Sequence, residues 1–433
     1  MAVIGAGGQG TALTKRLLGI RGVRVAAVVD PDSQRSGRLA ASIEGNTGRR
    51  PDAVADMRGV FDDPGIEAVV VATPNHWHAL AAVWALNAGK HLYLEKPATH
   101  NAGERAALLA AAKASGLVVE VGTQRRSHPG LQEAIAALQS GIIGPVNLAR
   151  CYSWKPRPSI GPAVSGTWPG TLDPELWFGP RRVTGPTRAK FHYDWHWYFD
   201  YGNGGLGNNG VHRLDVARWG MALPEAPDRV LAVGGRLGPP DAGQTPNTAL
   251  TLVAFGDRVV THDLRGLPTT PDAGMRGDDE VAFVGDGASI VLNGKGGRLV
   301  DAAGRIVRDY GQDASKTDPM TRHLRGFVKA VRDGDPGAVA VGLAEGVAAA
   351  GMCHAPSDAL RSGAGRVDPD VVIGQAQSLG GPAITAAVES FLAHALAKQG
   401  SASLLTSGIR RAPGLVDAVD GYEYRDDYRL LAV

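Results

Sequence analysis

The chain begins, after Met1, with Ala2-Val3-Ile4-Gly5-Ala6-Gly7-Gly8-Gln9-Gly10. This segment predicts the fold of the N-terminal part of the chain. A short apolar run leads into a GxGxxG turn that opens a helix, and Asp30 follows 20 residues after Gly10, at the end of the next apolar run. Gly5 permits the tight turn, Gly7 lets the backbone approach a pyrophosphate, and Gly10 allows close packing of helix on strand. Asp30 can then accept hydrogen bonds from a ribose. The sequence therefore predicts a Rossmann-type site for a nicotinamide dinucleotide.

The cofactor predicted for this site is NAD, because the Asp30 carboxylate repels the 2'-phosphate of NADP. Arg35 nearby keeps NADP open as the less favoured alternative. Further contacts are expected where later strands end, since ligands of open α/β sheets bind at the carboxyl ends of the strands. The residues expected to line the cofactor are Gly5, Gly7, Gly8, Gln9, Gly10, Asp30, Thr73, Pro74, Asn75, His78, Glu95, Lys96 and Gln124.

Three segments follow from the pattern of apolar runs. Residues 1–122 alternate β-branched runs with Ala/Leu-rich helical stretches, which predicts βαβ units and a parallel Rossmann sheet. Residues 123–355 become aromatic and Pro/Gly-rich and then give short strand-like runs, which predicts a mostly antiparallel, open-sheet α+β domain. Residues 356–433 are expected to form a helical and irregular C-terminal extension that could pack back on the Rossmann domain. The expected Rossmann strands are 2–5, 23–29, 67–72, 90–94 and 117–121.

The composition of the 433-residue chain narrows the classes of protein. Apolar residues make up 44% and charged residues 20%, as in ordinary globular domains, and 45 basic against 43 acidic residues give a net charge of +2. The sequence has neither a long basic run nor an apolar run of membrane-spanning length, so neither a nucleic acid nor a membrane is an expected partner. Two distant cysteines predict reduced thiols in the cytoplasm and no structural zinc site. The first strand begins almost at Met1, which leaves open a preceding segment such as an export signal.

Residues 151–201 are dense in aromatic side chains and hold five of the eight tryptophans. Aromatic faces stack on the C–H faces of sugars, and the polar edges of Tyr and Trp bind hydroxyls, so the segment predicts a carbohydrate site. A buried aromatic core or a subunit interface is the alternative. We expect His192, Asp194 or His196 to reach the substrate. His192 and His196 offer only two ligands, so no metal is predicted.

Two polar motifs carry the candidate chemistry. Leu94-Glu95-Lys96-Pro97 lies at a strand end, where the Lys96 ammonium can polarise a substrate oxygen and stabilise alkoxide charge. His212 is the candidate general base, because an unperturbed imidazole, with a pKa of about 6.5, exchanges protons near neutral pH. Asp215 could orient substrate or pair with Arg213 or Arg218. The helix face expected to look into the cleft carries Asn208, His212, Asp215 and Trp219.

The chain resembles the Gfo/Idh/MocA oxidoreductases, the family of glucose-fructose oxidoreductase and inositol dehydrogenase. The resemblance rests on the combination of the GxGxxG turn, Thr73-Pro74, Glu95-Lys96-Pro97 and the run 204–215. The resemblance implies hydride transfer at a ring hydroxyl of a sugar, glycoside or cyclitol. It also implies that the second domain binds substrate and assembles the chain into a dimer or tetramer. Inositol-dehydrogenase-like members carry an aspartate four residues before the histidine, where this chain has Asn208, so the role of base rests on His212 alone.

The leading hypothesis is an NAD(P)-dependent oxidoreductase acting on CH–OH groups. One alternative is a redox-neutral enzyme that retains its NAD and cleaves glycosides through transient 3-oxidation and elimination. Another is a non-catalytic NAD-binding sensor. The residues expected at the catalytic centre are Lys96, His212 and Asn208. Those expected to bind substrate are Lys96, Arg125, Arg157, Tyr193, His196, Trp197, Asn208 and His212.

Overall fold

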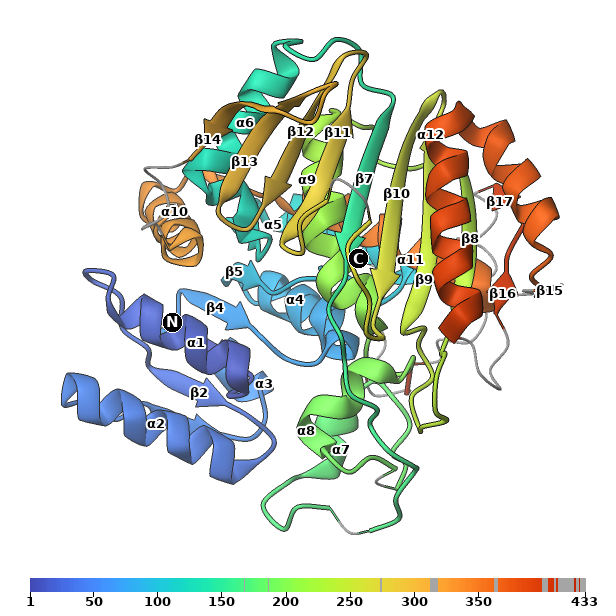
Figure 1. Ribbon diagram of the computed structural model, residues 1–433. Helices are drawn as coiled ribbons and strands as arrows, with labels where there is room; N and C mark the ends of the chain where they lie inside the picture. The colour runs from blue at the N-terminus through green and yellow to red at the C-terminus, as the bar shows by residue number, and fades with distance from the viewer. Residues whose placement is uncertain are drawn as a thin grey trace.

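The computed structural model holds two sheets with their covering helices, one from each half of the chain (Figure 1). The residues it describes are 1–166, 168–185, 187–272, 275–311, 318–361, 365–398, 404–408, 410–411, 424–425 and 428. No helix within these ranges combines the length and the apolar character needed to span a bilayer.

The N-terminal domain is built on a six-stranded parallel sheet in the order β3-β2-β1-β4-β5-β6. Its strands are β1 (Ala2–Ile4), β2 (Ala27–Val29), β3 (Asp52–Val54), β4 (Ala68–Val71), β5 (His91–Leu94) and β6 (Val119–Val121). Apolar runs supply the inner strands because both faces of a parallel sheet are buried. The sequence did not predict β3, whose residues are polar at the start and mostly exposed at the sheet edge.

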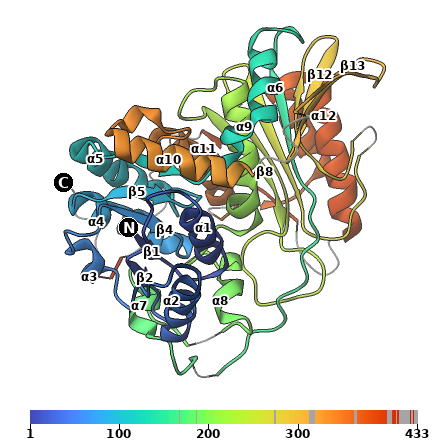
Figure 2. The same cartoon turned by 90° about the vertical axis from the view of Figure 1, so that its left-hand side faces the viewer.

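Helices cover both faces of this sheet, so alternate residues of β1 enter different cores. Ala2 and Ile4 belong to one apolar cluster and Val3 to another. The helices are α1 (Gly8–Leu18), α2 (Ser33–Thr47), α3 (Arg58–Phe61), α4 (His78–Asn87) and α5 (Arg105–Ser115). Helix α10 (Pro319–Asp333) also enters this core, where Phe327 joins the cluster of Val3, and Figure 2 shows it over the N-terminal domain. Helix α10 of the segment 123–355 therefore packs on the Rossmann domain.

The second domain is a large sheet of eleven strands in the described part of the chain, mostly antiparallel as predicted. The exception is β7, which runs parallel to β10. Its long strands are β7 (Leu148–Ser153), β8 (Arg229–Gly235), β9 (Thr248–Phe255), β10 (Arg258–Arg265), β11 (Asp279–Val284), β12 (Ala288–Asn293), β13 (Gly296–Asp301) and β14 (Ile306–Tyr310). The short strands β15 (Gly365–Arg366), β16 (Leu405–Thr406) and β17 (Arg410–Arg411) extend it at the β8 edge.

Helices pack on each side of this sheet. On one side lie α6 (Pro129–Gln139), α9 (Val211–Gly220) and α11 (Leu343–Arg361), which share an apolar core with it. On the other side α12 (Pro369–Lys398) packs on β8, β9 and β10. The short helices α7 (Pro174–Phe178) and α8 (Phe191–Asp194) lie apart, below the sheet in Figure 1.

The described part of the C-terminal extension contacts both domains. Helix α12 packs on the large sheet, whereas the extension was expected to pack on the Rossmann domain. Further along, Tyr428 packs against Trp77 and Trp84 in the Rossmann core, and the Tyr424 hydroxyl donates to Glu104 Oε1.

Candidate active site

The turn between β1 and α1 has the shape that a pyrophosphate needs. Gly5 has a φ of +98°, and a Cβ there would lie 2.5 Å from the Ala72 carbonyl oxygen. A Cβ on Gly10 would lie 1.8 Å from the Gly5 carbonyl oxygen, so only glycine fits at either position. Gly7, the N-cap of α1, makes no side-chain cap, which leaves N–H groups of the first helical turn available to an anion.

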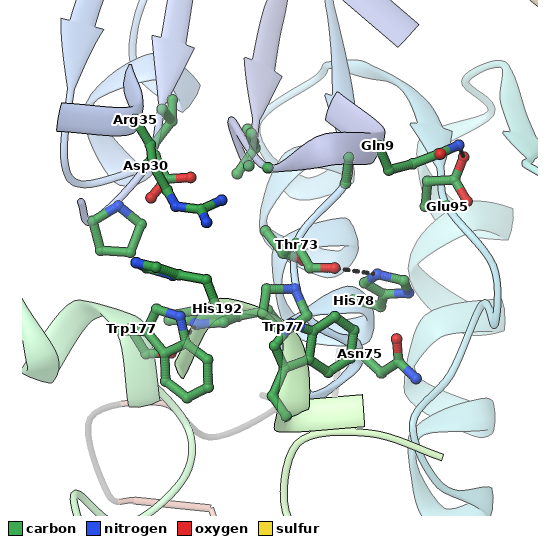
Figure 3. A pocket seen from close by; sticks show the side chains of 18 of the residues that line it. Gln9, Asp30, Arg35, Thr73, Asn75, Trp77, His78, Glu95, Trp177 and His192 are labelled. Atoms are coloured by element: carbon green, nitrogen blue, oxygen red, sulfur yellow. Dashed lines mark hydrogen bonds between the residues drawn. The ribbon is translucent and has the colours of Figure 1, made fainter. Parts of the chain in front are cut away.

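Asp30 follows β2 directly and lies beside this turn. Its Oδ2 accepts the N–H of Ala6 at 2.8 Å, and its Oδ1 accepts the N–H of Asp32 at 2.9 Å. Burial raises the pKa of Asp30, while these two donors and the charge of Arg35 lower it. Figure 3 shows the carboxylate next to the Arg35 guanidinium. Each oxygen keeps a lone pair for a ribose hydroxyl, so turn and carboxylate together fit a dinucleotide.

A cavity of about 640 Å³ runs from the glycine turn to the carboxyl ends of β4 and β5. We call it the inner cavity. The predicted residues in its wall are Gly5, Gly7, Gly8, Gln9, Asp30, Thr73, Pro74, Asn75, His78, Glu95, Lys96, Tyr193, His196 and Asn208. The predicted residues outside its wall are Gly10, Gln124, Arg125, Arg157, Trp197 and His212. The structure thus brings together nearly all of the cofactor residues and only part of the substrate set.

Polar contacts at the end of β5 join the cofactor turn to the candidate chemistry. Gln9 Nε2 donates to Glu95 Oε1 at 2.7 Å. Burial raises the pKa of Glu95, and the neighbouring Lys96 ammonium opposes that shift. His78 fixes the two loops at this edge, with Nδ1 2.7 Å from the Pro97 oxygen and Nε2 3.0 Å from the Thr73 oxygen (Figure 3).

Lys96 is held at the inner cavity by Asn208. Its Nζ donates to the Asn208 backbone oxygen at 3.0 Å and to Asn208 Oδ1 at 2.9 Å. Burial lowers the pKa of Lys96, and the Glu95 carboxylate opposes that shift. An ammonium has three donors, so one remains for a ligand oxygen. Asn208 therefore positions Lys96.

The helix expected to carry Asn208, His212 and Asp215 on one face begins as the π-helix η5 (Leu206–Gly210) and continues as α9. The wider turn breaks the regular spacing on which a common face for Asn208 and Asp215 depended. The Asp215 carboxylate accepts three hydrogen bonds from Arg126, at 2.7 to 3.1 Å. Asp215 is therefore a structural ion-pair partner, and its arginine is not one of the two expected.

His212 lies in α9, close enough to Lys96 for that charge to act on it. Its Nδ1 is buried and has no hydrogen-bond partner among the described residues. Burial first, and then the Lys96 charge, hold the pKa of His212 well below its usual range. The ring is therefore neutral at physiological pH, as a proton acceptor must be, although it stands outside the cavity wall.

Arg125 does not reach the inner cavity. Its guanidinium pairs with Glu280, which also accepts from Arg213 Nη2 at 2.9 Å. Gln124, in the short helix η3 (Gln124–Ser127), also stands outside the wall. The expectation that Arg125 offers a free donor to substrate is corrected by this long-range ion pair.

The aromatic residues of 151–201 divide between core and cavity. Their buried cluster, which also includes Leu172, consists of Trp177, Phe178, Phe191, Tyr198 and Tyr201. Trp177 and Phe191 of this cluster also line the inner cavity. Tyr193, which is 47% exposed, lines the inner cavity together with Trp195 and His196. Asp194 instead accepts the N–H of Lys190. The segment therefore forms a buried aromatic core, part of which also faces the cavity.

One site feature was not predicted, a segment that covers the ribose end of the cofactor site. We call residues 171–178 and 191–192 the strap. Asp32 Oδ1 accepts from the Thr171 hydroxyl at 2.7 Å, and Asp32 Oδ2 lies 2.9 Å from His192 Nε2. Burial raises the pKa of Asp32, but these hydrogen bonds outweigh it and hold the pKa below its usual value. Trp177 and His192 face Asp30 across the cavity (Figure 3). The sequence feature that could have indicated the strap is the high density of aromatic residues in 151–201.

The comparison with families concerns the N-terminal domain. The model of the Gfo/Idh/MocA oxidoreductases, described as an oxidoreductase family with an NAD-binding Rossmann fold, matches residues 1–123. Over residues 1–123 the chain therefore matches this family, and the glycine turn and Asp30 lie within the matched NAD-binding Rossmann fold.

Individual relatives agree with this assignment. Levoglucosan dehydrogenase of Pseudarthrobacter phenanthrenivorans is 26% identical over 230 residues, which are 48% of this chain and 51% of that protein. Inositol 2-dehydrogenase 1 of Saccharopolyspora erythraea is 35% identical over 153 residues, which are 35% of this chain and 44% of that protein. The chain thus spans about half the length of these curated relatives.

A solved structure extends the likeness to both domains. Levoglucosan dehydrogenase, in a complex with NADH and levoglucosan, superposes with a TM-score of 0.57 at 20% identity, over 82% of this chain and 94% of that one. At this identity the likeness concerns the fold alone, and it confirms the two-domain architecture.

Proposed function

We propose that this protein is an NAD-dependent oxidoreductase that transfers hydride between the cofactor and a ring CH–OH group of a sugar, glycoside or cyclitol. The observation that carries the proposal is the Lys96 ammonium, held by Asn208 in the wall of the same cavity that the cofactor turn lines. The names of the relatives, levoglucosan and inositol dehydrogenases, support the substrate class.

The side chains of this cavity suit the oxidation of an alcohol. Bound NAD supplies the hydride acceptor. Lys96 donates a hydrogen bond to the substrate oxygen and stabilises the alkoxide charge that develops there. The hydroxyl proton passes to the neutral ring of His212. In the reverse direction the same groups return the proton to a ketone oxygen.

Substitution of Lys96 tests the proposal. Lys96→Met should lower kcat by about 10²- to 10³-fold, because the developing alkoxide loses its donor, while NAD affinity stays within about twofold. The assay follows NADH formation with a panel of pyranosides and cyclitols, and NAD affinity is measured separately by calorimetry.

The matched control is Lys113→Met, which removes an exposed lysine of α5. Unchanged turnover in Lys96→Met would overturn the catalytic assignment. NAD binding without turnover on any alcohol would favour the non-catalytic sensor instead.

A second candidate, glycoside cleavage with retained NAD, is favoured by the strap, which covers the ribose end of the cavity. His192, His196 and Tyr193, in the wall, are candidates for the extra base. Denaturing the purified protein and identifying the released nucleotide tests retention. Cleavage products without net NADH would support this candidate, and accumulating NADH would support the dehydrogenase.

A further inference from the structure

We propose that the substrate carries a second unit beside the reacting ring, and that Lys155 and Arg157 bind an anionic group, a carboxylate or a sulfate, on that unit. The inference rests on the proposed function, since it places the reacting ring at Lys96. It names the substrate class that the rest of the cavity system fits.

Two smaller cavities share wall residues with the inner cavity or with each other. The first, of about 140 Å³, shares Tyr193 with the inner cavity. The second, of about 180 Å³, shares Arg157 and Trp197 with the first, and we call it the outer cavity. Asn208 and Asn209, consecutive residues of η5, line the inner and the outer cavity respectively. The three cavities therefore adjoin one another along shared wall residues, so the outer cavity lies near a ligand that begins at Lys96.

Part of the outer cavity wall is apolar, of the kind that binds a sugar ring. Its wall includes Trp197, Pro158, Leu237, Pro239 and Leu267. Apolar C–H faces of a pyranose stack on aromatic and proline surfaces, while its hydroxyls turn toward polar groups. Sites for a separate ligand usually measure about 300 to 1,000 Å³. At about 180 Å³ the outer cavity is smaller than that, so it suits one added sugar unit of a larger substrate.

The charges of the outer cavity favour an anion. The acidic residue in its wall, Asp241, is already paired with Arg236, whose Nη2 donates to it at 2.7 Å. Arg157, by contrast, donates to the neutral Tyr193 hydroxyl at 3.2 Å and lies 5.8 Å from the centre of the Trp197 ring. With Lys155 beside it, the wall carries positive charge without a matching carboxylate. A guanidinium of this kind binds a carboxylate or a sulfate through paired hydrogen bonds.

The position of Arg157 also connects the outer cavity to the reacting end. Its backbone N–H donates to the Gly266 oxygen at 2.8 Å, which fixes the loop just after β10. Burial lowers the pKa of Lys96 and that of His196, and the charge of Arg157 contributes to both shifts. The guanidinium therefore lies within electrostatic reach of the reacting ring.

The test compares matched substrates on the NAD-loaded protein. The single ring that turns over best is compared with glycosides in which that ring carries a neutral hexose, a hexuronate or a sulfated hexose. We expect kcat/KM at least about 10-fold higher for one of the two anionic glycosides than for the neutral one. The uronate and sulfate arms then show which anion the site takes.

Arg157→Gln should reduce kcat/KM for the preferred anionic glycoside by about 10- to 100-fold more than it reduces kcat/KM for the single ring. Lys155→Gln should act in the same direction with a smaller effect. The control is Arg182→Gln, an exposed arginine outside the walls of all three cavities.

Equal kcat/KM for neutral and anionic glycosides, or an equal loss on every substrate in Arg157→Gln, would overturn the inference while the proposed function stands. If no ring turns over, the proposed function fails. Calorimetry of the NAD-loaded protein with the disaccharide uronate and its sulfated counterpart then decides the inference separately. Binding that Arg157→Gln weakens supports it, and binding of neither compound overturns it.

Discussion

The two ends of the inner cavity are held in position by different means. At the cofactor end the backbone itself fixes the shape of the site, because a Cβ on Gly5 or Gly10 would overlap neighbouring backbone atoms. At the reacting end, side chains from distant segments hold one another, as in Lys96 with Asn208 and Arg126 with Asp215. A site built from consecutive residues can be recognised in a sequence, whereas a site built from distant pairs cannot. Three substitutions sharpen this contrast.

The largest effect is expected at the cofactor end. Gly10→Ala places a Cβ 1.8 Å from the Gly5 oxygen, so the turn must open. We expect loss of measurable NAD binding and a destabilisation of about 5 kcal/mol, the upper end for a single substitution. Urea unfolding and NAD titration provide the measurement.

The matched control is Gly37→Ala in α2, where nothing lies within 4 Å of the added Cβ. Alanine should stabilise this helix by about 0.5–1 kcal/mol. If Gly10→Ala bound NAD like the unaltered protein, the backbone account of the cofactor end would be wrong.

A smaller effect is expected for the ion pair behind the reacting end. Asp215 is fully buried, and Asp215→Asn leaves the Arg126 guanidinium, 11% exposed, without its anion. We expect a loss of about 3 kcal/mol in the free energy of unfolding, measured in urea. Asp56→Asn breaks an exposed pair with Arg58 and should cost less than about 1 kcal/mol. Similar losses in both variants would contradict this account.

The smallest effect concerns a neutral pair at the far edge of the Rossmann sheet. Glu120 Oε1 lies 3.1 Å from His323 Nδ1, where burial raises the pKa of Glu120 to about 8 and lowers the pKa of His323 to about 4. Between about pH 4.5 and 6.5 the two shifts oppose each other, since folded Glu120 retains a proton and folded His323 lacks one. Above about pH 6.5 only Glu120 contributes, and the folded state binds more protons than the unfolded state until about pH 8.

Stability should therefore fall by about 2 kcal/mol between pH 6.5 and pH 8, at about 1.4 kcal/mol per pH unit. Glu120→Gln cannot ionise and should flatten that part of the profile. Urea unfolding across this range measures the difference between the two proteins. Parallel profiles would show that Glu120 does not titrate there.

The same contrast explains what could be predicted from the sequence. The Rossmann sheet, the glycine turn and the position of Asp30 follow from local motifs, and the family assignment confirms the fold. Strand β3 was missed because an exposed edge strand shows no apolar pattern. Arg125 pairs with Glu280, which lies 155 residues further along the chain, and a local sequence pattern cannot predict a pair at that separation. The π-helix was missed because helical periodicity assumes 3.6 residues per turn.

The strap matters to anyone who wishes to engineer this protein for a different cofactor. Thr171 holds Asp32, two positions from Asp30, although 139 residues separate the two ends of that hydrogen bond. A mutant library confined to residues 30–35 would change the anchor of the strap along with the ribose site. Variants selected for binding a 2'-phosphate would then be screened in a protein whose strap has lost its hydrogen bonds to Asp32. A library that varies positions 171 and 192 together with 30–35 lets the strap and the ribose site change together. A change of cofactor specificity in this protein therefore requires the redesign of both segments.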